Sequence, residues 1–121
     1  MRVIIAGSRD HDHFVLQDLC QAIEESGFEI TAVLVTGDDG VSELAAKWAG
    51  QHQIPILVFA REPADPTKSA AAKRNSSMAD QADALICLHH GTKGSWSIMQ
   101  EMRRRGKPVH EVQWSGKLGE A

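Results

Sequence analysis

The chain has 121 residues, a formal net charge of −3, and 42% apolar and 24% charged residues. This length and balance predict one globular domain over residues 1–121, with a core large enough to fold without disulfides or metals. The acidic balance, with three Phe, three Trp and no Tyr, argues against broad binding of nucleic acid. The longest apolar stretch, Ile54 to Ala60, is far too short to span a bilayer, so we expect no membrane partner.

Two cysteines and the amino-terminal residues bear on the cellular compartment. Cys20 and Cys87 lie in apolar surroundings and form no CxxC pair, which is typical of buried thiols in a reducing compartment. The stretch from Met1 to Gly7 lacks the long apolar region of a signal peptide. We therefore expect a cytoplasmic location.

Short apolar segments alternate with helical patterns along the chain. The first four segments are apolar throughout, which is typical of parallel strands covered on both faces. Asp12 is expected to cap the first helix, which ends at Gly27, and Ser95 to cap the last. The predicted strands are residues 3–6, 32–35, 56–59, 84–88 and 109–114, and the predicted helices are residues 12–27, 41–50, 69–81 and 95–105.

This alternation predicts an α/β fold, a three-layer α/β/α sandwich with a mainly parallel five-stranded sheet. The segment from Arg61 to Lys68, with Pro63 and Pro66, is predicted to be a loop that can act as a lid. The tail from Ser115 to Ala121 is predicted to be frayed.

Ligands of open parallel sheets bind beyond the carboxyl ends of the strands, so the loops after the strands carry the candidate binding residues. Three of these loops contain glycine, which lets the backbone approach a ligand closely. The loop from Gly91 to Ser95 has the donors of a phosphate cradle, although a tight turn with a Ser cap explains it equally well. Its spacing matches neither a Walker A loop nor GxGxxG. The candidates in these loops are Gly7, Ser8, Arg9, Gly37, Asp38, Asp39, Gly40, Ser42, Gly91, Thr92, Lys93, Gly94 and Ser95.

Basic residues on the third and fourth helices allow two interpretations. Arg74 is able to fork onto a phosphate and Asn75 to hydrogen-bond a sugar or base, or both belong to an exposed polar face. The run from Arg103 to Arg105 suits the negative end of the last helix, and we favour that over a phosphate site.

These segments together resemble the SLOG superfamily, named for the Smf/DprA proteins and the lonely-guy enzymes, and in particular its small YspA-like branch. The resemblance runs in order from about Arg2 to Trp114 and implies a Rossmann-like sheet that binds nucleotides or nucleotide-derived signals. The residues that carry it are 7–9, 40–49, 73–78, 82–86 and 91–95.

Lonely-guy enzymes cleave the N-glycosidic bond of nucleoside monophosphates, and their motifs are only partly present. Arg74 and Met78 match the Arg-Lys-x-x-Met helix, but the catalytic Glu of the second motif would fall at Ile98. Water activation at such a bond normally needs a carboxylate. Glu101, one helical turn further on, is our candidate to replace the missing catalytic carboxylate, with Asp38, Asp39 and Glu43 as alternatives. Arg74 is our candidate for the catalytic residue that binds the phosphate.

Four hypotheses follow. The first is a binding module for a nucleotide or nucleotide-derived signal, either a sensor or a sequestering protein, and the second is a nucleotide hydrolase. A metal enzyme is the third; His11, His13, His89 and His90 are suitable ligands, but HxH spacing is a weak signal, and we predict no metal and no cofactor. The fourth, DNA handling, is disfavoured by the charge. A homo-oligomer is expected, with Trp48, Trp96 and Trp114 as candidates for a shared surface or for the core.

Overall fold

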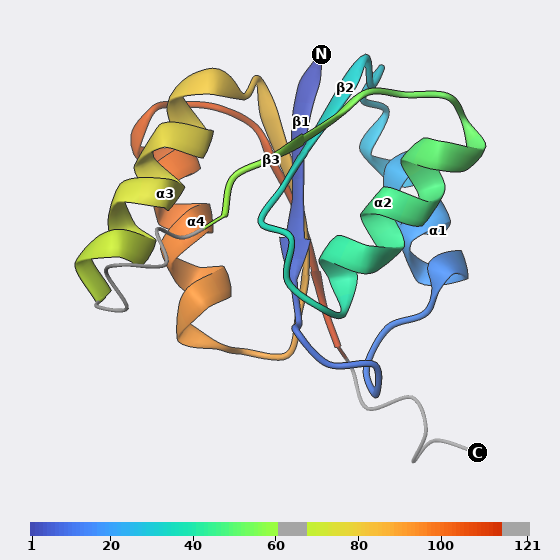
Figure 1. Cartoon of the computed structure of the whole chain (residues 1–121), viewed down its shortest axis with the longest axis horizontal. Coiled ribbons are helices and arrows are strands. Elements are labelled where there is room, and N and C mark those ends of the chain that lie inside the picture. The colour runs from blue at the N-terminus through green and yellow to red at the C-terminus, as the bar shows by residue number, and fades with distance from the viewer. Residues whose placement is uncertain (61–67, 115–121) are drawn as a thin grey trace.

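The computed structural model describes residues 1–60 and 68–114, which form a Rossmann-like α/β domain (Figure 1). All strand pairings of its five-stranded sheet are parallel, in the order β3-β2-β1-β4-β5. No helix in this part of the chain is long and apolar enough to cross a membrane. The elements are β1 (Arg2–Gly7), α1 (Leu16–Ser26), β2 (Ala32–Val35), α2 (Val41–Gln51), β3 (Ile56–Val58), α3 (Lys68–Gln81), β4 (Ala84–His89), α4 (Lys93–Arg104) and β5 (Val109–Gln113).

Two predicted segments fall largely or wholly on residues that the structure does not describe. The expected lid loop from Arg61 to Lys68 lies outside the described residues, except for Lys68 at the start of α3. The expected frayed tail from Ser115 to Ala121 lies outside them entirely.

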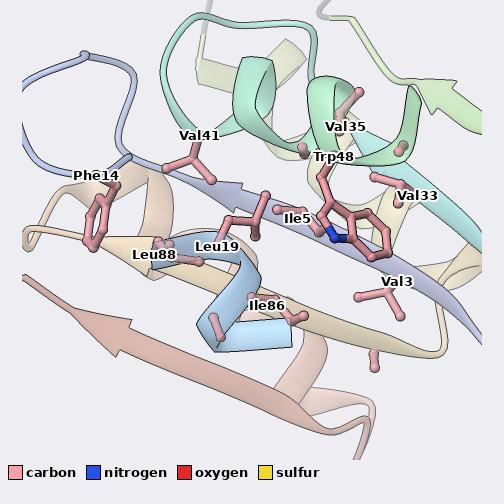
Figure 2. Packing of buried hydrophobic residues seen from close by; sticks show 14 residues of the cluster. Val3, Ile5, Phe14, Leu19, Val33, Val35, Val41, Trp48, Ile86 and Leu88 are labelled. Carbon is pink, nitrogen blue, oxygen red and sulfur yellow. The ribbon is translucent and has the colours of Figure 1, made fainter. Parts of the chain in front are cut away.

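The two helical layers cover opposite faces of the sheet. Successive strand side chains point to opposite faces, so Val3 and Ile5 of β1 belong to a core with α1 and α2, whereas Ile4 and Ala6 belong to a core with α3 and α4. Figure 2 shows the first core, in which Trp48 of α2 lies over the strands. Trp48 is therefore a core residue, and its candidate role in a shared surface is not needed to explain it.

The third strand corrects one expectation. Its apolar run predicts burial on both faces, yet Ile56, Leu57 and Val58 are all exposed. The reason is its place in the sheet, because β3 is an edge strand paired only with β2. The helix beside it, α2, packs on β1 and β2 instead. An apolar strand sequence is therefore compatible with an edge position.

Two helix starts also differ from the prediction. Helix α1 begins at Leu16, not near Asp12, because the Asp18 carboxylate accepts the Val15 N–H at 2.8 Å and fixes the first turn there. Helix α4 begins at Lys93, with Thr92 as the N-cap in place of Ser95. The Thr92 hydroxyl accepts the Ser95 N–H at 3.4 Å, which is the usual reach of a cap to the third residue of a helix.

The two cysteines are both free but differ in environment. Cys87 is buried in β4 as expected, and burial raises the pKa of its thiol to about 12. Cys20 is exposed on α1, contrary to the expectation of burial, because Leu19 and Ala22 form the inward face of that helix.

Candidate functional site

A cavity of about 450 Å³ lies at the carboxyl edge of the sheet, where β1, β2 and β4 end. In Figure 1 this is the edge opposite the amino terminus. The volume falls within the range of small-molecule sites, and the position is the one at which open parallel sheets bind ligands. The lining residues are Ala6, Gly7, Arg9, Asp10, Thr36, Asp38, Ser42, Arg74, Asn75, Met78, His90, Thr92, Gly94, Ser95 and Ile98.

The structure brings most of the predicted binding residues together at this cavity, although they come from four separate segments of the chain. Those that line it are Gly7, Arg9, Asp38, Ser42, Arg74, Asn75, Thr92, Gly94 and Ser95. Six others do not line it, namely Ser8, Gly37, Asp39, Gly40, Gly91 and Lys93. Of these, Ser8 is buried and Lys93 is exposed, so the positive charge expected from Lys93 is not part of the cavity wall.

Several lining residues were not among the predicted binding residues. Asp10, Thr36 and His90 lie in the loops that follow β1, β2 and β4. The rule that ligands bind beyond the carboxyl ends of the strands therefore includes them when it is applied to every residue of those loops. Met78 and Ile98 lie on helices, and their positions follow from the motif comparison. Nothing in the sequence marks Ala6, a strand residue of β1, as a lining residue.

Backbone contacts hold the three loops in place around the cavity. The Ser8 N–H donates to Leu88 O of β4, and Ser8 O accepts the Val41 N–H at the start of α2, both at 2.9 Å. This close crossing leaves no space for a side chain on Gly40, whose φ is +76° and whose added Cβ would lie 2.2 Å from Ser8 O. Gly40 therefore shapes the site without lining it.

The polar wall of the cavity combines two arginines with two carboxylates. Arg9 Nε lies 3.6 Å from Asp38 Oδ2, and Asp38 also accepts the Thr36 hydroxyl at 2.8 Å. From α3, Arg74 donates to Asn75 Oδ1 at 3.3 Å, and Asn75 is buried with its amide donating to Ser97 Oγ. The guanidinium groups match the geometry of a phosphate or carboxylate.

The start of α4 forms another part of the wall. Thr92, Gly94 and Ser95 line the cavity there, and the first N–H groups of a helix have no partner within it. The helix dipole adds a partial positive charge at this point, which favours an anion. The alternative interpretation of this loop, a tight turn with a Ser cap, is wrong about the capping residue, since Thr92 and not Ser95 caps the helix.

Glu101 does not reach the cavity. Its carboxylate faces Arg105 at 2.9 Å and Arg104 at 3.2 Å along α4, and it is absent from the lining residues. Ile98 lines the cavity, whereas Glu101, three residues further along α4, pairs with arginines of its own helix. The placement does not support the expected catalytic role of Glu101. The arginines at the end of α4 form ion pairs with Asp80, Glu101 and Glu111, and none of them lines the cavity.

A buried histidine fixes the loop that leads into α4. The Gly91 N–H donates to His89 Nδ1 at 3.0 Å, so the His89 proton is on Nε2 and is donated to Glu111 Oε2 at 2.7 Å. Arg103 donates to the other oxygen of Glu111 at 3.0 Å. The hydrogen bond from His89, followed by that from Arg103, lowers the pKa of Glu111 below its ordinary value.

Replacing Glu111 by glutamine is expected to lower the free energy of unfolding by roughly 0.5–1 kcal/mol at pH 7, because a partly exposed ion pair is screened by solvent. Since the folded pKa of Glu111 lies below its ordinary value, its stabilisation is full above the unfolded pKa and is lost as the pH falls through the folded one. The free energies of unfolding of wild type and Glu111→Gln therefore become more similar in acid. Urea unfolding at several pH values measures this difference in free energy, with Glu24→Gln as the control. A difference that persists in acid would contradict the stabilising role given to the Glu111 carboxylate.

The fold and the cavity define a Rossmann-like α/β protein with a ligand-sized site at the carboxyl edge of its sheet. The chain matches no protein-family model and no curated protein. Among solved structures it is similar to the C-terminal domain of a hydrogenase from Pyrococcus furiosus, with a TM-score of 0.46 and 10% identity over 92% of this chain and 90% of that one. At that identity and TM-score the likeness bears on neither ligand nor activity.

Proposed function

We propose that this chain is a small SLOG-like binding domain for a nucleotide or a nucleotide-derived signal, acting as a sensor or as a sequestering protein in the cytoplasm. The observation that carries the proposal is the cavity of about 450 Å³, into which Arg9, Arg74 and the start of α4 all face. An anionic group of the ligand would replace Asp38 as the partner of Arg9. Asn75, Thr36 and Ser42 offer hydrogen bonds to a sugar or base.

Calorimetry with nucleoside monophosphates, ADP-ribose, NAD and cyclic dinucleotides tests the proposal. We expect saturable binding of at least one compound with one site per chain. A mass spectrum of small molecules released from the purified protein by heat would identify a ligand that co-purifies. Absence of binding to every compound at millimolar concentration, by protein shown to be folded, would contradict the proposal.

The alternative is a hydrolase of nucleoside monophosphates or related nucleotides. The observation that favours it is Asp38, a carboxylate that lines the same cavity as Arg74. Chromatography of a nucleotide panel after incubation detects a released base. Asp38→Asn is expected to abolish such release and Asp39→Asn to leave it unchanged, because Asp39 is exposed and does not line the cavity. Release that survives Asp38→Asn excludes this version of the mechanism.

A homo-oligomer remains part of the proposal. Ile56, Leu57 and Val58 expose apolar side chains along a sheet edge, and Trp96 is exposed on α4. Exposed apolar edges of this kind are candidates for association between chains. Light scattering of the purified protein measures the oligomeric state, and a mass equal to one chain at all concentrations would contradict this part.

A further inference from the structure

Two histidines and an aspartate from distant parts of the chain meet beside the cavity. Asp10 and His13 belong to the segment between β1 and α1, and His90 follows β4. One ligand atom from each of the three lies within 4.8 Å of those of the others, and all three side chains are partly buried. The imidazole rings of His13 and His90 are stacked, with centroids 3.9 Å apart and planes 5° from parallel.

We propose that Asp10, His13 and His90 bind a divalent transition-metal ion of the Zn²⁺ type. Two imidazoles and one carboxylate form a donor set that suits zinc and similar borderline ions better than Ca²⁺ or Mg²⁺, which prefer oxygen ligands. The single carboxylate offsets part of the charge of the ion. Three protein ligands leave a coordination position for water or for an oxygen of a ligand, and Asp10 and His90 both line the cavity.

Neighbouring groups already orient the donors. His13 Nδ1 lies 2.7 Å from Asp10 Oδ1. Two tetrahedral ligands at about 2.0–2.1 Å from one zinc ion are roughly 3.3–3.4 Å apart, so these two atoms move apart when the ion binds. His90 Nδ1 lies 2.6 Å from the Ser8 hydroxyl, whose position is fixed by the backbone contact of Ser8 with Leu88. These hydrogen bonds hold the three side chains close together, and the ion would replace the hydrogen bond between His13 and Asp10, because a ligating nitrogen must be unprotonated.

Binding also requires a change in the stack of the two rings. A metal ion lies near the plane of each imidazole that binds it, and two parallel rings cannot both satisfy this condition. One ring must therefore turn out of the stack. His90 has room to do so, because its side chain borders the open cavity, although turning breaks its hydrogen bond to the Ser8 hydroxyl. His13 contacts the rings of both His90 and Trp114. Loss of the stack on metal addition is thus part of the proposal.

A second group of possible ligands provides an internal comparison. His11, Asp39 and Glu43 also lie within reach of one another, but all three are exposed. His11 Nε2 is 3.8 Å from Glu43 Oε1, and water competes with an ion at such a site. The partly buried group should bind more tightly, so variants of His11 are the matched control for variants of His13 and His90.

The test uses untagged full-length protein stripped by a chelator and titrated with Co²⁺, followed by its d–d absorption, and with Zn²⁺ in competition. We expect one ion per chain with a micromolar or lower Kd. His13→Gln and His90→Gln should each weaken binding by roughly 10–100-fold or more, and His11→Gln by less than about twofold. Absence of saturable binding, or weakening by His11→Gln with no effect of the other two variants, would overturn the proposal.

A second measurement does not depend on the variants folding. In wild-type protein, long-range proton–nitrogen NMR spectra report each histidine ring during Zn²⁺ addition. We expect the ring nitrogens of His13 and His90 to shift and the ring-current shifts of the stack to disappear. Shifts confined to His11, or to histidines outside the group such as His52 and His110, would overturn the assignment. Neither measurement depends on the proposed nucleotide ligand.

Discussion

Gly40→Ala is expected to lower the free energy of unfolding by roughly 3 kcal/mol or more. The added Cβ would lie 2.2 Å from Ser8 O and 2.7 Å from Asp10 O, which are backbone atoms of the segment after β1. The φ of +76° is also unfavourable for alanine. Relief of the clash must move that segment away from α2 and open the cavity.

The same helix provides the control for this prediction. Gly50 lies within α2, has no described atom within 4 Å of an added Cβ, and is not among the glycines with positive φ. Gly50→Ala is therefore expected to stabilise the protein by about 0.5–1 kcal/mol through the higher helix propensity of alanine. Urea unfolding followed by circular dichroism measures both variants. Equal stability of Gly40→Ala and wild type would contradict the close packing of Gly40 against the segment after β1.

Arg74→Ala is expected to raise the Kd of whichever nucleotide binds by roughly 10–100-fold, which corresponds to the loss of charge-assisted hydrogen bonds worth about 1.5–3 kcal/mol. Arg74 lines the cavity on the side formed by α3, where its guanidinium contacts Asn75. Arg74→Lys should recover only part of the affinity, because an ammonium group lacks the planar fork. Calorimetry with the tightest-binding compound of the panel measures these changes.

Arg104→Ala removes an equal charge from a site away from the cavity. Its exposed guanidinium pairs with Glu101 outside the cavity, so affinity should be nearly unchanged. Thermal unfolding of both variants separates a loss of binding from a loss of structure. Similar affinities for Arg74→Ala and Arg104→Ala would place the anionic group of the ligand elsewhere.

The sheet and its helices could be predicted from the sequence because their signals are local. Apolar runs separated by helical repeats identify all five strands within two residues, and Ala32–Val35 is predicted without error. What a local pattern does not contain is the position of a strand in the sheet. The residues of β3 resemble those of β2 in composition, yet β2 lies inside the sheet and β3 forms its edge. The position of each strand depends on the order in which distant segments pair.

The candidate site could likewise be predicted only in part from the sequence. The rule that ligands bind beyond the carboxyl ends of parallel strands selects the correct loops, so Arg9, Asp38 and Thr92 are found in the cavity wall. The rule does not say which way each side chain points. Lys93 and Glu101 have suitable chemistry but do not line the cavity. The contact of His13 with His90 joins segments that no spacing rule connects.

The pairing of β1 with β4 has a consequence for how the chain folds. Val3 lies beside Ala84 and Gly7 beside Leu88, so the centre of the sheet closes only when segments about 80 residues apart meet. During synthesis, β1 can pair early with β2, but its other edge stays open until β4 leaves the ribosome. Until then the apolar edge is a site for pairing with another chain, and a fragment ending before Ala84 would aggregate rather than bind. Binding competence therefore appears late, with the segment that also supplies His90 and α4.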